Sequence, residues 1–266
     1  MFSTLIIIIN YKNSMEGKFI KKVIYCKNKR NEKIYGEAFI PMKEGPFPLL
    51  IFSHGYGYTL SFLEPEKLAL NGIAVYQFEF CGGSPNSKSE GKPTEMSVLT
   101  EAEDLECVIN QMKTQNFVDK NKIYLSGCSQ GGFVTIIVGE KLQNEIKGLF
   151  LYCPFLKIKD IEKKFFMKKE IPNIFRFGNM EISKKYFEDV RECDIYSAIK
   201  NIKIPFLYYH GDKDEIVDVE YAYKAQKYFG NNGKLVILKN SGHRLNYGNE
   251  DRLFSDITNF ILKNKF

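Results

Sequence analysis

The chain has 266 residues, of which 44% are hydrophobic and 26% are charged, and these proportions are typical of an ordinary globular protein. They exclude intrinsic disorder, and the length favours one large α/β domain or such a domain with a modest insertion. The net charge is +6, yet only five of the 38 basic residues are arginine. Because arginine is the usual reader of phosphates and bases, we expect no nucleic-acid partner.

The six cysteines include no CxxC pair and have no histidine at ligand spacing, so neither a zinc site nor a redox dithiol is predicted. The apolar run at residues 5–9 is far shorter than the ~20 residues that a membrane span needs, and no basic residue precedes it as in a signal peptide. We therefore expect a cytoplasmic protein with no membrane partner. Residues 1–18 are predicted to be an N-terminal extension.

The first regular elements predicted are two β-rich runs between residues 19 and 40, separated by a polar turn at 27–31, which indicates an antiparallel hairpin. From residue 47 onward, short apolar runs alternate with longer helix-like segments. The apolar runs are PLLIFSHG, IAVYQFEF, KIYLSG, IKGLFLYCPF, PFLYYHG and KLVILKN, and a helix-like segment ends the chain. This alternation predicts the α/β class, with a mostly parallel central sheet covered by helices on both faces.

One interval interrupts this alternation. Between the strand ending near Phe155 and the strand starting near Pro205 lie about fifty residues with helix-like pieces but no clear strand, whereas connections usually take a few residues. We expect residues 156–200 to form an inserted cap between two parts of one core, residues 19–155 and 201–266. The cap is expected to set the choice of substrate and to leave the catalytic geometry alone.

Residues 127–131 read Gly-Cys-Ser-Gln-Gly, a G-x-S-x-G pattern between an apolar strand and a helix-like run. In that setting the pattern predicts a strained strand-to-helix turn that exposes the serine, with glycines that let neighbouring elements pass closely. The alternative is an ordinary glycine-rich turn. Because the strand and the helix stand where the motif requires them, Ser129 is the predicted nucleophile.

A serine hydroxyl needs a general base, which is usually a histidine oriented by a carboxylate. The chain offers three histidines: His54, His210 and His243. In α/β-type serine hydrolases the order along the chain is serine, acid, histidine, and only His243 follows both the serine and an acidic loop. His243 is the predicted base, and His210 is expected to be a packed structural residue at the end of its strand.

The acid is expected in the loop after PFLYYHG, which holds four candidates: Asp212, Asp214, Glu215 and Asp218. Spacing alone does not choose among them. We favour Asp214, since aspartates are preferred in turns and before helices, and these roles suit Asp212 and Asp218.

The segment HGYG at residues 54–57 follows the first parallel strand. At that place such hydrolases take one backbone N–H for the oxyanion hole, and the second N–H comes from the residue after the serine. Tyr56 and Gln130 are therefore the predicted donors. Taken alone, HGYG would indicate only a loop made flexible by glycine.

From about residue 20 to the C-terminus, the chain resembles the α/β-hydrolase superfamily on the motifs HGYG, GCSQGG, HGDKDEIV and SGH. The stretch FEFCGGSPNSKSEGKPTEMSVLTEAEDL is similar to small bacterial serine esterases of the feruloyl (cinnamoyl) type, which are often grouped with serine aminopeptidase-like hydrolases. The resemblance implies an α/β-hydrolase fold with an inserted cap. It also implies Ser129 as nucleophile, Asp214 as acid, His243 as base, and the amides of Tyr56 and Gln130 as oxyanion donors. Two positions depart from the pattern: Glu79 replaces a common Asp, and Cys128 replaces a common His.

These observations predict a serine hydrolase that cleaves carboxylic esters, of hydroxycinnamoyl or other aryl or short acyl type, through an acyl-enzyme. The predicted partner is a small-molecule ester, and neither a cofactor nor a metal is implied. The phenylalanines and tyrosines of the cap would form either an aromatic wall for the substrate or the core of the cap itself. One alternative is an aminopeptidase or acyl-peptide hydrolase with the same triad, which an acidic pair in the site would distinguish. The other is a non-catalytic ligand-binding protein that retains the fold.

Overall fold

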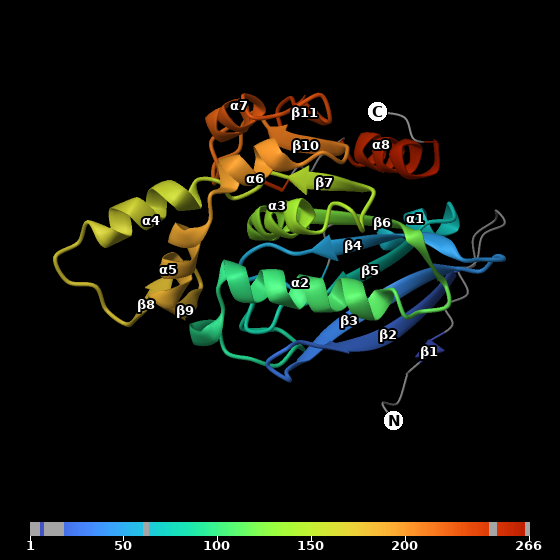
Figure 1. Ribbon diagram of the computed structural model, residues 1–266, viewed down its shortest axis with the longest axis horizontal. Helices are drawn as coiled ribbons and strands as arrows, with labels where there is room; N and C mark the ends of the chain where they lie inside the picture. The colour runs from blue at the N-terminus through green and yellow to red at the C-terminus, as the bar shows by residue number, and fades with distance from the viewer. Residues whose placement is uncertain (1–5, 8–18, 61–63, 245–248, 264–266) are drawn as a thin grey trace.

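The computed structural model describes residues 6–7, 19–60, 64–244 and 249–263. Their main feature is a nine-stranded sheet with the strand order β1-β2-β3-β5-β4-β6-β7-β10-β11. Figure 1 shows helices on two sides of this sheet and a lobe at one end, toward which the arrowheads of β4, β7 and β10 point. The carboxyl ends of the parallel strands therefore face the lobe.

The predicted hairpin is formed by β2 (Phe19–Lys27) and β3 (Lys33–Pro41), which pair antiparallel along their whole lengths. Strand β1 (Ile6–Ile7) pairs antiparallel with β2, so a part of the predicted N-terminal extension joins the edge of the sheet. The rest of that extension lies outside the described residues. Strand β3 joins the hairpin to the remaining sheet by antiparallel pairing with β5.

The other six strands run parallel to one another: β4 (Phe47–Ser53), β5 (Ala74–Phe78), β6 (Val118–Cys128), β7 (Gly148–Tyr152), β10 (Phe206–Gly211) and β11 (Gly233–Leu238). Most of their residues are buried, as expected for strands that are covered on both faces. The prediction of a mostly parallel sheet in an α/β-hydrolase fold is confirmed.

Alternate strand residues pack against different helices. On one face lie α2 (Val98–Met112), α3 (Gln130–Lys141) and α7 (Glu220–Gln226), and on the other lie α1 (Pro65–Leu70) and α8 (Glu250–Lys263). Ile51 thus belongs to the core under α2 and α3, whereas its neighbour Leu50 belongs to the core under α1 and α8. This two-sided packing follows from the period-2 alternation of side chains along a strand.

The interval between β7 and β10 forms the lobe. It contains α4 (Ile158–Phe166), β8 (Ile174–Phe177), β9 (Met180–Ser183), α5 (Lys185–Glu192) and α6 (Ile195–Asn201). The sequence predicted no clear strand here, and that expectation is wrong, because β8 and β9 pair antiparallel around the two-residue turn Gly178-Asn179. Each strand has only four residues, which is too short for alternation to stand out, although a Gly-Asn turn is a hairpin signal. The limits 156 and 200 stay a prediction, and we call these residues the inserted segment.

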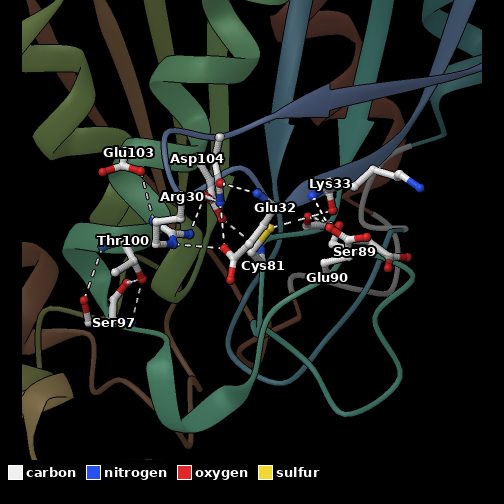
Figure 2. A network of polar contacts seen from close by, with 12 residues as sticks. Arg30, Glu32, Lys33, Cys81, Ser89, Glu90, Ser97, Thr100, Glu103 and Asp104 are labelled. Atoms are coloured by element: carbon white, nitrogen blue, oxygen red, sulfur yellow. Dashed lines mark hydrogen bonds and ion pairs between the residues drawn. The ribbon is translucent and has the colours of Figure 1, made fainter. Parts of the chain in front are cut away.

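A polar network fastens the β2–β3 turn to α2 (Figure 2). The guanidinium of Arg30 donates to Asp104 over 2.8 Å and to Glu103 over 3.1 Å. The side-chain amide of Asn28 and the backbone N–H of Cys81 also donate to Asp104, over 2.8 and 2.9 Å. The fully buried Asp104 thereby receives three hydrogen bonds and one charge partner.

A 3-10 helix, Pro93–Glu95, precedes α2. Among the helices of the described ranges, none combines the length and the hydrophobicity that crossing a lipid bilayer requires.

Candidate active site

Ser129 occupies a sharp turn between β6 and α3. Its backbone has φ 52° and ψ −118°, a left-handed conformation that is strained for a residue with a side chain. The turn is held from both sides: the N–H of Ser129 donates to the carbonyl of Tyr152 over 2.9 Å, and its own carbonyl accepts from Phe133 and Phe155. Such strain persists only where the surroundings enforce it, and it is the geometry that the G-x-S-x-G pattern predicts.

The two glycines of the motif are required by close backbone contacts. A Cβ at Gly131 would lie 2.4 Å from the carbonyl oxygens of Ser53 and His54, and a Cβ at Gly127 would lie 2.3 Å from the carbonyl oxygen of Gly131. No side chain fits at such distances, so the turn can pass this close to the end of β4 only with glycine at both positions.

Asp214 and His243, which are 29 residues apart in the sequence, meet beyond the ends of β10 and β11. The Nδ1 of His243 donates to Asp214, at 2.8 Å from Oδ2 and 3.0 Å from Oδ1. The amides of Ile216 and Val217 donate to the same carboxylate over 2.9 and 2.8 Å. Burial by itself raises the pKa of Asp214, but the hydrogen bonds from His243 and the two amides outweigh it and lower the pKa. A neutral histidine that donates from Nδ1 carries its lone pair on Nε2, where it can accept a proton.

The other acidic candidates of this loop have different surroundings. Asp218 accepts from the N–H of Glu220 over 3.0 Å, in the turn that leads into α7, and Asp212 is exposed. The carboxylate of Glu215 accepts from the backbone N–H of His243 over 3.4 Å, away from the imidazole. Of the four candidates, Asp214 is the one whose side chain contacts the ring.

Asp214 also belongs to a buried cluster with Cys153 and His210, whose ligand-type atoms lie within 4.8 Å of one another. The residues are of types that bind metal ions, but the carboxylate of Asp214 and the Nε2 of His210 already make hydrogen bonds within the protein. The Nε2 of His210 donates to the carbonyl of Val217 over 2.8 Å and lies 3.3 Å from Asp214. Burial raises the pKa of the Cys153 thiol well above its usual value, whereas metal binding needs a thiolate. The cluster therefore serves as a support for the acid.

The HGYG loop lies against the serine. A Cβ at Gly55 would be 3.2 Å from the Cβ of Ser129. The Nδ1 of His54 donates to the carbonyl of Gly55 over 2.8 Å, and its Nε2 accepts from the N–H of Phe80 over 3.0 Å. Burial lowers the pKa of His54 to about 4, so the ring is neutral at pH 7 and both nitrogens are engaged. His54 therefore holds the loop in place and is not available as a base.

The two predicted oxyanion donors lie beside Ser129. Gln130 is the first residue of α3, so its N–H is one of the helix N-terminal amides that have no acceptor within the helix. Tyr56 directly follows Gly55, which contacts the serine. Whether these amides bind an oxyanion stays a prediction at this point.

Sequence reasoning did not find the residues that hold the side chains of these donors. The side-chain amide of Gln130 donates to Glu101 of α2 over 2.8 Å and accepts from the hydroxyl of Tyr186 of α5. The hydroxyl of Tyr56 donates to the carbonyl of Phe177 over 2.7 Å. A signal for Glu101 was present, because it is an acidic residue on the otherwise apolar stripe of α2 that includes 98, 105, 108 and 112.

The aromatic residues of the inserted segment pack mainly on one another. The rings of Phe165 and Phe175 are 4.6 Å apart, those of Phe165 and Phe187 are 4.7 Å apart, and Phe175 stacks on Phe187 at 5.8 Å. These three residues form a small core of the segment. The sequence left two roles for the aromatic residues, a wall for the substrate or a core of the segment, and these three residues have the second.

The class of this protein follows from the sheet and from the turn at Ser129: it is an α/β hydrolase. Solved structures share the fold. "Ferulic Acid bound to Est1E from Butyrivibrio proteoclasticus" aligns with a TM-score of 0.80 and 22% identity over 90% of this chain and 98% of that one. Acetyl xylan esterase 1 from a Thermoanaerobacterium species aligns with a TM-score of 0.68 and 16% identity, over 97% of this chain and 88% of that one.

Residues 62–265 match the prolyl oligopeptidase family, and the chain belongs to that family. Protein bem46 of Schizosaccharomyces pombe is 33% identical over 174 residues, which are 64% of this chain and 52% of that protein. The uncharacterized peptidase YuxL of Bacillus subtilis is 26% identical over 220 residues, 76% of this chain and 32% of that protein. The chain thus spans about half and about a third of the lengths of these curated relatives. Fold and family together support a hydrolase.

Proposed function

We propose that the chain is a serine hydrolase that cleaves carboxylic esters of small molecules through an acyl-enzyme. The observation that carries the proposal is the hydrogen bond between Asp214 and His243, at the sheet edge where a strained turn presents Ser129. A lowered pKa keeps Asp214 ionised, so it fixes the tautomer of His243 and stabilises the imidazolium that forms during catalysis.

In this mechanism Nε2 of His243 takes the proton of Ser129 as the serine oxygen attacks the ester carbonyl. The oxyanion accepts hydrogen bonds from the backbone N–H groups of Tyr56 and Gln130, each worth about 3 kcal/mol in the transition state. The alcohol leaves with the proton from His243. Water then attacks the acyl-enzyme with His243 as base, and the acid is released. The residues named supply every step, so the proposal includes neither a metal nor a cofactor.

The proposed substrates are aryl or short acyl esters, hydroxycinnamoyl esters among them. The sequence resemblance to feruloyl-type esterases supports this class, and a protein of the same fold is known with ferulic acid bound. Both arguments concern related proteins, so a panel of esters is the direct test.

Hydrolysis of peptides with the same residues is the second candidate, and it is favoured by the match to the prolyl oligopeptidase family. An aminopeptidase would need negative charge to hold a free amino terminus. Glu215 beside His243 is exposed, and burial raises the pKa of Glu101 well above its usual value, which disfavours the charged form of Glu101. Burial thus disfavours this role for Glu101, and the relative turnover of esters and aminoacyl anilides decides between the two candidates.

The test is labelling with a fluorophosphonate, combined with a panel of p-nitrophenyl esters, hydroxycinnamate esters and aminoacyl p-nitroanilides. We expect rapid labelling at Ser129 and turnover of esters above anilides. Ser129→Ala should lose about 10⁴-fold in kcat or more, because triad members act as a unit. Ser255→Ala, an exposed serine of α8, is the matched control and should behave as the wild type. Absent labelling of the wild type, or more than a tenth of its rate in Ser129→Ala, would refute the proposal.

The acid is tested by a matched pair in one loop. Asp214→Asn should lower kcat by about 10⁴-fold, because the asparagine favours the wrong tautomer of His243. Asp212→Asn, an exposed position two residues away, should leave kcat within about twofold. The reverse result would place the acid at Asp212.

A further inference from the structure

Both residues that we propose as oxyanion donors are held by the inserted segment through their side chains. The hydroxyl of Tyr56 donates to the carbonyl of Phe177, the last residue of β8, over 2.7 Å. The ring of Tyr56 also packs edge-on against Phe177 and Tyr186, with centroids 5.3 and 6.0 Å away. Gln130 accepts a hydrogen bond from the hydroxyl of the same Tyr186, on α5. Two separate parts of the segment therefore contact the two sides of the proposed oxyanion hole.

The contact at Gln130 is buried and leaves its amide group little freedom. Gln130 and Glu101 are 1% exposed, and Tyr186 is fully buried. The amide oxygen of Gln130 is held by Tyr186 and its nitrogen by Glu101, so both ends of the amide are engaged. The nitrogen has a second acceptor in the Sδ of Met96, 3.7 Å away. Breaking the bond from Tyr186 would remove the partner of the buried amide oxygen, which costs about 1–3 kcal/mol. The side chain thereby fixes the residue whose backbone N–H we propose as an oxyanion donor.

Helix α5 has an independent attachment that defines its position. The hydroxyl of Ser97, the N-cap of α2, donates to Asp189 on α5, and Lys185 of α5 pairs with the same carboxylate. Because α2 also carries Glu101, the helices α2, α3 and α5 are linked in a closed set of hydrogen bonds around Gln130. Tyr186 is consequently held where it can orient Gln130.

We infer that the inserted segment positions the oxyanion hole, with Tyr186 acting through Gln130 and the carbonyl of Phe177 acting through Tyr56. The inference rests on the proposed function, and it assigns Tyr186 and the hydroxyl of Tyr56 as positioning residues. Oxyanion donors act only when they lie about 2.7–3.1 Å from the developing charge. A small displacement of either amide therefore reduces the stabilisation of the transition state more than the binding of the substrate. The segment is then a part of the catalytic apparatus, in addition to any role in choosing substrates.

The test uses the full chain and p-nitrophenyl acetate, whose acetyl group is too small for recognition by an acyl pocket to dominate. Tyr186→Phe removes one hydroxyl and keeps the ring. We expect kcat to fall roughly tenfold or more with KM changed less than about twofold, because the lost interaction acts in the transition state. Binding of an aryl trifluoromethyl ketone, which forms a tetrahedral oxyanion on the serine, should weaken by the same factor as kcat/KM.

Tyr221→Phe is the matched control. Its hydroxyl donates to Asp160 over 2.6 Å, so it also joins the inserted segment to the core. This hydrogen bond involves neither Tyr56 nor Gln130. We expect its kcat on the acetate ester to be unchanged. Equal losses of kcat in Tyr186→Phe and Tyr221→Phe would mean that any contact between the segment and the core has the same effect. That result would overturn the inference.

An unchanged kcat for Tyr186→Phe would also overturn the inference. If the KM for methyl ferulate changed while kcat did not, the segment would act on substrate choice alone. If Tyr186→Phe does not fold, Tyr56→Phe decides, because this half-buried residue loses only its bond to Phe177 and the same drop in kcat is expected. The proposed function fails separately, when the wild-type protein neither reacts with the fluorophosphonate nor hydrolyses the ester.

Discussion

Helix α2 carries two buried carboxyl groups three residues apart, and the protein surrounds them in opposite ways. Asp104 faces the β2–β3 turn and receives the guanidinium of Arg30 and two further N–H donors (Figure 2). Glu101 lies on the side of Ser129 and accepts a hydrogen bond from the neutral side-chain amide of Gln130 over 2.8 Å. Burial raises the pKa of both groups. The donors around Asp104 oppose this effect and leave its pKa at about 6, whereas the pKa of Glu101 lies well above its usual value.

The guanidinium of Arg30 thus favours the carboxylate form of Asp104, whereas burial favours the neutral form of Glu101. The ion pair at Asp104 anchors the β2–β3 turn to α2, one helical turn along from Glu101. A negative charge at Glu101 would lie close to the place where the oxyanion forms and would repel it. The comparison teaches that this helix places a charge in its structural contact and neutral hydrogen bonds in the contact that supports the proposed catalytic residues.

The largest effect is expected when the cation of the structural contact is removed. Arg30→Gln leaves Asp104 buried without its charge partner, which should lower the free energy of unfolding by about 3–5 kcal/mol at pH 7.5. Urea unfolding followed by circular dichroism measures the loss. Ester hydrolysis below the unfolding transition should stay close to wild type, because the hydrogen bonds of Arg30 go to Glu32, Glu103 and Asp104, and none of these is proposed to act in catalysis. A loss below about 1 kcal/mol would show that the pair is not structural.

The same variant should regain stability as the pH falls. The charge of Arg30 lowers the pKa of Asp104, so without it the pKa in the folded state rises above about 6, while the usual value is 3.8. The folded state then holds a proton that the unfolded state releases, and the free energy of unfolding increases as the pH falls through the folded-state pKa. The stability deficit of Arg30→Gln should therefore narrow between pH 7.5 and pH 5.5. A deficit that is constant over this range would contradict the titration of Asp104.

Asp104→Asn should have a smaller effect. The amide keeps one acceptor oxygen, but its NH₂ group faces a donor, the side chain of Asn28 or the N–H of Cys81. We expect a loss of about 1–3 kcal/mol in the free energy of unfolding at pH 7.5. A value near zero would indicate that Asp104 is already protonated at that pH.

Glu101→Gln, the same acid-to-amide change at the neighbouring position, should have the smallest effect. A protonated carboxyl and an amide both offer one acceptor oxygen to Gln130, so stability should change by less than about 1 kcal/mol at pH 7.5. Because the pKa of Glu101 is raised in the folded state, the free energy of unfolding of the wild type declines as the pH rises through that pKa. The glutamine variant has no such group and should lack this decline. Thermal unfolding between pH 6 and pH 9 measures both. A loss as large as that of Asp104→Asn would mean that Glu101 is ionised.

Much of the fold and part of the candidate site could be predicted from local patterns. Alternating apolar runs predicted the parallel strands and their helices, and the hairpin of residues 19–41 was evident from two β-rich runs around a polar turn. The short hairpin β8–β9 was missed, because four-residue strands carry too little periodicity. Among four acidic residues in one loop, sequence favoured Asp214 by weighing turn and capping roles, and the direct contact with His243 depends on how two loops meet.

By itself, the sequence determined the features that arise within a few residues. These are the strained turn at Ser129, which glycines at 127 and 131 permit, and the alternation of strands and helices, which follows from side-chain period. Only the tertiary structure decided which distant side chains meet. Tyr186 lies 56 residues from Gln130, and Arg30 lies 74 residues from Asp104. Such contacts depend on the packing of whole elements against one another, and no local pattern of residues encodes that packing.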